Sequence, residues 1–65
     1  MRIRVNGNWM ELDAETVAAV LEHFSLTDKK VAVELDGVVV DRKNWADTAV
    51  REGAVLEIVQ FVSGG

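Results

Sequence analysis

Hydrophobic and polar residues alternate at the start of the 65-residue chain, and this alternation predicts a β-hairpin. In residues 1–6 the odd positions are apolar and the even positions are Arg or Asn, as in a strand with one buried face. Asn6-Gly7 is typical of a tight hairpin turn. Residues 9–12 are therefore expected to return as the second strand, with Met10 and Leu12 inward.

The second half of the chain carries three further strand patterns. Residues 31–35 alternate with Val31, Val33 and Leu35 on the core side, and Asp36-Gly37 then turns the chain into a short apolar strand. The apolar run at residues 54–62 predicts the last and longest strand.

Between the two hairpins the spacing of apolar residues changes to that of a helix. Residues 13–24 place Val17, Val20, Leu21 and Phe24 on one stripe, and the candidate N-cap residues are Thr16 and Asp13. A single amphipathic helix must bury its stripe on a sheet, so we expect a two-layer α+β domain. Its sheet would be mixed, with about five strands, and with the first and last strands at its centre.

The segment at residues 42–53 is polar with isolated apolar residues, and it predicts a loop with a short helical turn. Trp45 is expected to anchor this crossing loop over the edge of the core. Trp9 is expected to be half-exposed at the rim of the sheet.

Composition narrows the possible functions. The length allows one domain, which we place at residues 1–62, and 49% hydrophobic residues give it a core. The chain has no cysteine, so it offers no thiol chemistry. A net charge of −4 with dispersed Lys and Arg argues against nucleic-acid binding. No run is apolar and long enough for a membrane span, and the first residues do not resemble a signal peptide, so a cytoplasmic protein is expected.

No catalytic constellation emerges from the polar residues. His23 is the single histidine and lies beside the helix stripe, where a structural or inert role is the expected one, because general acid–base catalysis needs a partner within reach. The Asp and Glu residues show no metal-ligand spacing. We therefore expect a non-enzymatic protein that binds no cofactor or metal itself.

The last strand predicts an exposed apolar cluster. Glu57 should face water, and alternation then places Val59 and Phe61 on the same side, while Leu56 and Ile58 face the helix. Exposed apolar clusters often mark docking sites, so Glu57, Val59 and Phe61 are candidate docking residues. The alternatives are that a loop covers Val59 and Phe61 or that they are scattered surface residues.

The chain ends in Ser63-Gly64-Gly65, which we predict to be a flexible tail. Such a tail is either a frayed end or a reactive one. A terminal glycine suits a carboxylate that must be activated and attacked, because it has no Cβ to block approach to the acyl carbon. The preceding glycine would let the backbone enter a narrow cleft.

The combined pattern resembles the ubiquitin-like β-grasp fold and, within it, the ThiS family of thiamine-biosynthesis sulfur carriers. The resemblance rests on four stretches that together span nearly the whole chain: VNG at 5–7, TVAAVL at 16–21, VAVELDGVVVDRKNWADTAVREG at 31–53 and EIVQFVSGG at 57–65. An Arg followed by Trp-Ala and then a Gly before the last strand is the more specific part.

The resemblance implies a carrier rather than a catalyst. An E1-like activating enzyme, using ATP and magnesium, would adenylate the carboxylate of Gly65, and sulfur from a persulfide donor would convert it to a thiocarboxylate. Thiazole synthase would receive that sulfur, with Gly64 and Ser63 providing access. The alternatives are the sulfur carrier of molybdopterin synthase, which shares the fold and the tail, and a ubiquitin-like protein modifier.

Overall fold

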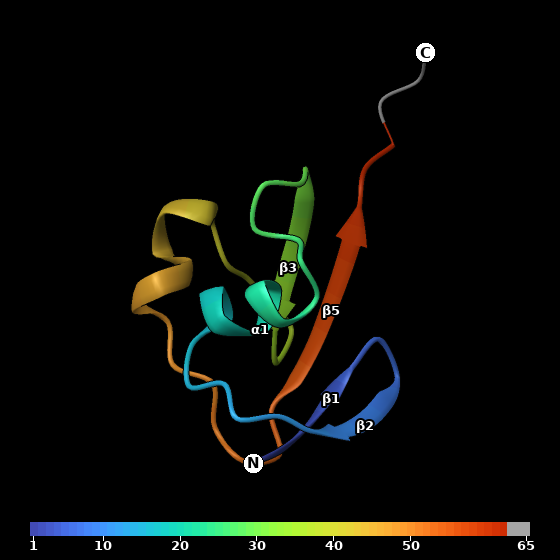
Figure 1. The fold of residues 1–65 in the computed structure, drawn as a ribbon, viewed down its shortest axis with the longest axis vertical. Helices are drawn as coiled ribbons and strands as arrows, with labels where there is room; N and C mark the ends of the chain where they lie inside the picture. The colour runs from blue at the N-terminus through green and yellow to red at the C-terminus, as the bar shows by residue number, and fades with distance from the viewer. Residues whose placement is uncertain (63–65) are drawn as a thin grey trace.

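The computed structural model describes residues 1–62, which form a five-stranded mixed sheet with one α-helix on one of its faces (Figure 1). The strand order is β2-β1-β5-β3-β4. Strands β1 and β5 pair in parallel, and the other neighbours pair antiparallel. The elements are β1 (Arg2–Val5), β2 (Asn8–Glu11), α1 (Val17–His23), β3 (Val31–Leu35), β4 (Val38–Val39), the 3-10 helix η1 (Arg42–Asp47) and β5 (Val55–Gln60).

This topology confirms the predicted two-layer β-grasp architecture. Strand β5 is the middle strand and β1 lies directly beside it, so the first and last strands are central as expected. The predicted flexible tail, Ser63 to Gly65, lies outside the described residues. Among residues 1–62 no helix is both long enough and apolar enough to span a membrane.

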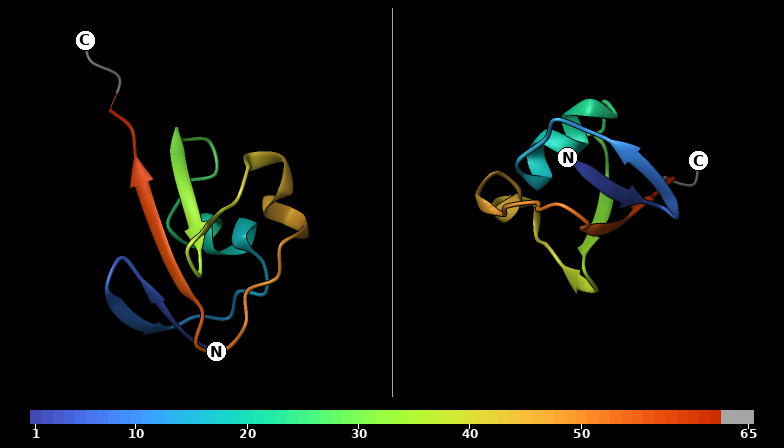
Figure 2. Two further views of the ribbon diagram at one scale, coloured as in Figure 1. Left: turned by 180° about the vertical axis from the view of Figure 1, so that it is seen from behind. Right: turned by 90° about the horizontal axis from the view of Figure 1, so that it is seen from below.

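The core lies between α1 and one face of the sheet, and α1 is seen on that side in both views of Figure 2. The alternation along the strands and the stripe along the helix point the same residues inward. Within residues 1–62, six side chains have no solvent exposure: Ile3, Val17, Val20, Leu21, Val33 and Leu56. Phe24, the last member of the predicted stripe, is half-buried at the C-terminal end of α1.

Both hairpin turns use a left-handed pair of residues. Asn6 and Gly7 have φ of 49° and 84°, and Asp36 and Gly37 have φ of 51° and 84°. Positive φ at both central residues matches the right-handed twist of the flanking strands, and Asn-Gly and Asp-Gly tolerate it best. The two dipeptides therefore set the register of β1 with β2 and of β3 with β4.

The helix begins after Thr16, the later of the two candidate N-cap residues, and residues 13–15 belong to neither a helix nor a strand. Thr16 is the N-cap, and its Oγ1 accepts a hydrogen bond from the N–H of Ala19 at 3.1 Å. Upstream, the carbonyl of Glu15 accepts from the N–H of Val50 at 2.9 Å. A helix starting at Asp13 would use the Glu15 carbonyl for its own hydrogen bonds, but here that carbonyl is bonded to Val50, far along the chain.

The crossing segment confirms the predicted role of Trp45. Its side chain is 5% exposed, and its Nε1–H donates to the carbonyl of Val40 at 3.0 Å. The Arg42 guanidinium lies over the Trp45 ring, 4.3 Å from the centroid. The same guanidinium donates to the carbonyls of Thr27 and Lys29, so Arg42 connects η1 to the loop between α1 and β3.

Candidate functional site

Strand β5 presents an apolar surface on the side of the sheet away from α1. Leu56 and Ile58 are buried, whereas the side chains of Val59 and Phe61 are 56% and 58% exposed. The predicted orientation of the strand is therefore correct, and no loop within residues 1–62 covers these two side chains. Phe61 follows the last β5 residue but keeps the phase of the strand, since its N–H donates to the carbonyl of Lys30 at 2.8 Å.

Neighbouring strands extend this surface. The register places Ala32 opposite Val59 and Glu34 opposite Glu57 on β3, and it places Val39 of β4 opposite Glu34. Directly opposite residues point to the same face. We define the outer face as the surface formed by Ala32, Glu34, Val39, Glu57, Val59 and Phe61.

A second group of side chains lies at the β1–β2 end of the same side of the sheet. Arg4 is directly opposite Trp9, and the guanidinium carbons of Arg2 and Arg4 lie 5.1 and 6.0 Å from the Trp9 ring centroid. Trp9 is 48% exposed, as the half-exposed rim position predicts. The contact of the two arginines with Trp9 is not among the predictions from the sequence, although alternation combined with the Asn6-Gly7 hairpin register gives the pairing of Arg4 with Trp9.

Two side chains that the sequence identifies only as turn residues also hold β5 in place. The Asn6 side chain donates from Nδ2 to the Ile58 carbonyl at 3.1 Å and accepts at Oδ1 from the Ile58 N–H at 2.7 Å. Asp36 Oδ1 accepts from the N–H of Val55 at 2.9 Å. Both hairpin turns are thereby fastened to the strand that leads to the tail.

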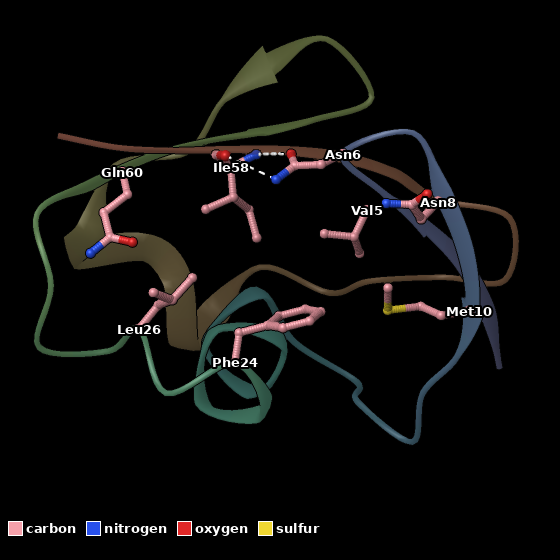
Figure 3. A pocket seen from close by; sticks show the side chains of 8 residues that line it. All are labelled: Val5, Asn6, Asn8, Met10, Phe24, Leu26, Ile58 and Gln60. Carbon is pink, nitrogen blue, oxygen red and sulfur yellow. Dashed lines mark hydrogen bonds between the residues drawn. The ribbon is translucent and has the colours of Figure 1, made fainter.

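An open cavity of about 420 Å³ lies on the other side of the sheet, between the β1–β2 hairpin and the end of α1 (Figure 3). Its walls are largely apolar, with Met10 and Phe24 facing Val5 and Ile58. The remaining lining residues are Asn6, Asn8, Leu26 and Gln60. None of these side chains titrates in the physiological range, so the cavity supplies no acid–base group.

Titratable groups form no catalytic arrangement in the described part of the chain. His23 is exposed at the end of α1. Its ring and the ring of Phe24 are in an edge-to-face arrangement, with centroids 4.9 Å apart. Within residues 1–62 no cluster of three or more His, Cys, Asp or Glu side chains is placed to hold a metal ion. The described residues instead present an exposed apolar surface at Val59 and Phe61. The tail residues Ser63, Gly64 and Gly65 lie outside the described residues.

The fold and this surface define a small β-grasp protein with an open sheet face. The ThiS family model matches residues 3–65, and the chain belongs to the ThiS family. The crystal structure of the thiamine biosynthesis protein ThiS from Geobacter metallireducens is 33% identical, covers all of both chains and superposes with a TM-score of 0.82. A solution NMR structure of a thiamine biosynthesis protein from the same organism is 30% identical, with a TM-score of 0.80, over all of this chain and 88% of that one.

Two longer curated relatives also match the whole chain. They are named thiazole synthase and come from Paramagnetospirillum magneticum, at 38% identity over 66 residues, and from Magnetococcus marinus, at 32%. This chain spans 20% of the length of each.

Proposed function

We propose that this chain is a sulfur carrier protein for the formation of the thiazole ring of thiamine, with the carboxylate of Gly65 as the carrying group. The observation that carries the proposal is the ThiS family match over residues 3–65, which includes Gly64 and Gly65. The relatives with thiamine biosynthesis and thiazole synthase in their names support the pathway and argue against molybdopterin synthase as the destination.

The chemistry begins with a carboxylate, which is a poor electrophile. An oxygen of the Gly65 carboxylate attacks the α-phosphorus of ATP, pyrophosphate leaves, and an acyl adenylate forms. The adenylating enzyme, of the E1-like class, would supply the ATP and magnesium site. In a pocket that excludes water, the mixed anhydride is protected from hydrolysis.

Sulfur then enters from a persulfide donor protein. The terminal sulfur of the persulfide attacks the acyl carbon and AMP leaves, which gives an acyl disulfide. A thiol cleaves this disulfide, so the donor side becomes an ordinary disulfide and Gly65 retains a thiocarboxylate. Because Gly65 has no Cβ and Gly64 permits any φ, both faces of the acyl carbon are accessible to the partner.

Docking of the partners would use Val59, Phe61 and Glu57. Val59 and Phe61 expose apolar side chains close to the end of the chain. Glu57 lies on the same face, two residues before Val59 in β5. A partner that covers this face would guide the residues after Val62 into its own active site. The chain then acts as a carrier substrate of its partners rather than as an enzyme.

The test is reconstitution with an adenylating enzyme, ATP, magnesium and a persulfide donor. The chain ending at Gly65 is expected to form a thiocarboxylate, and the variant lacking Gly65 is expected to form none, because its carboxylate is retracted by about 3.3–3.6 Å. Normal thiocarboxylate formation in the shortened variant would refute the assignment of Gly65.

A further inference from the structure

Two acidic residues lie directly opposite each other on the outer face. Glu34 of β3 and Glu57 of β5 are directly opposite in the antiparallel register, and both are exposed. Directly opposite residues have Cβ atoms about 4.5–5.5 Å apart, and a like-charged pair at this distance destabilises a sheet. The fold therefore carries an unfavourable pair at this position.

No basic group within residues 1–62 forms an ion pair with Glu34 or Glu57. Among residues 1–62 the one ion pair joins the N-terminal ammonium to Glu11 at 3.7 Å. Arg2 and Arg4 lie beside Trp9 at the β1–β2 end of the sheet. A cation from another molecule would therefore relieve the repulsion between Glu34 and Glu57.

The surroundings of the pair favour a long basic side chain. Val39 lies opposite Glu34, and Val59 and Ala32 form the next row on the same face. Val39 and Val59 are 65% and 56% exposed. Lys and Arg pack their aliphatic stems on apolar surface while the charged head reaches a carboxylate, and a guanidinium can engage two carboxylate groups at once.

We propose that thiazole synthase presents a Lys or Arg side chain that binds between Glu34 and Glu57, and that this contact orients the carrier on that enzyme. The proposal rests on the proposed function and assigns the Glu34–Glu57 pair, rather than the whole outer face, to one of its partners. Thiazole synthase is the favoured occupant because two proteins of that name contain a segment similar to this whole chain. In these two proteins the similar segment makes up 20% of a longer chain, and its covalent link gives it a high effective concentration toward the rest of that chain.

The experiment measures the Kd between the carrier and purified thiazole synthase. The variant Glu34→Gln/Glu57→Gln is compared with Glu15→Gln/Glu22→Gln, which removes the same charge from exposed positions before and on α1. We expect the first variant to bind at least about tenfold more weakly and the second to bind within about twofold of wild type. The salt dependence of Kd between about 0.05 and about 0.5 M should become shallower in the first variant only.

A melting curve separates binding from folding. Removing the repulsion should leave the Glu34→Gln/Glu57→Gln variant at least as stable as wild type, so weaker binding with an unchanged or raised Tm supports the proposal. An equal loss of affinity for thiazole synthase in both double variants overturns the proposal, and so does wild-type affinity in Glu34→Gln/Glu57→Gln. A loss that appears with the adenylating enzyme and not with thiazole synthase also overturns it.

Thiocarboxylate formation, measured separately by mass, tests the proposed function. If the wild-type chain binds thiazole synthase through the acidic pair but never gains sulfur, the proposed function fails while the docking inference stands.

Discussion

The side chain of Asn6 adds two hydrogen bonds to the pairing between β1 and β5. Its amide both donates to and accepts from the backbone of Ile58, so it continues the β1–β5 pairing beyond Val5. The same residue holds a φ of 49°, which Asn tolerates better than most side chains. Asn6 thus adopts the backbone conformation that the turn requires and also holds β5 by hydrogen bonds.

Replacing Asn6 by glycine separates these two roles, because glycine keeps the positive φ but has no amide. We expect Asn6→Gly to lower the free energy of unfolding by about 1–3 kcal/mol, since the N–H and C=O of Ile58 lose their partners. Asn8→Ala is the matched control on the other side of the turn. Equal stability of the Asn6 variant and wild type in denaturant unfolding would show that the amide contacts are unimportant.

Phe61 tests the outer face at the level of one side chain. Because Phe61 is 58% exposed, Phe61→Ala should change the free energy of unfolding by about 0.5 kcal/mol or less while weakening binding to the adenylating enzyme about tenfold. Val62→Ala, at a side chain that is 90% exposed, is the control and should bind normally. Titration calorimetry and thermal unfolding measure the two quantities. Unchanged affinity, or gross unfolding, would contradict the docking role.

At the scale of elements, η1 is held by the two residues that make the family pattern recognisable. Trp45 fills the edge of the core, and Arg42 covers its ring and reaches two carbonyls of the α1–β3 loop. These contacts connect segments that are 13 and 15 residues apart in the chain. The conspicuous Arg and Trp-Ala stretch therefore has a structural explanation.

Arg42→Ala removes both carbonyl contacts and the stacking on Trp45. We expect it to lower the free energy of unfolding by about 1–2 kcal/mol, measured by urea unfolding. Lys43→Ala, at the next position, which is also exposed, should have little effect. A similar fall in the free energy of unfolding in both variants would mean that positive charge in general, rather than the specific contacts of Arg42, stabilises η1.

Local sequence patterns predicted most helices and strands, because the conformation that each segment favours by itself is the one that it adopts in the complete fold. Alternation gave the facing of β1, β3 and β5, and Asn-Gly and Asp-Gly gave both turns. The start of α1 was harder to predict, since the hydrogen bond between Val50 and Glu15 joins residues far apart in sequence. The Glu34–Glu57 pair was missed for the same reason: it exists only once the β3–β5 register is known.

The whole molecule has one covered and one open sheet face. The helix, η1 and their loops bury the inner face, whereas Val39, Val59 and Phe61 remain exposed on the other. Strand β5 lies at the centre of the sheet, between β1 and β3.

The most direct measurement is the accurate mass of the C-terminal proteolytic fragment of protein taken from cells. Isolating this fragment excludes oxidation of Met1 and Met10, which adds the same nominal mass as exchange of oxygen for sulfur. We expect a population in which one oxygen of the fragment ending at Gly65 is replaced by sulfur. A fragment that never carries sulfur, with the adenylating enzyme and persulfide donor present, would contradict the assignment of Gly65 as the sulfur-carrying residue.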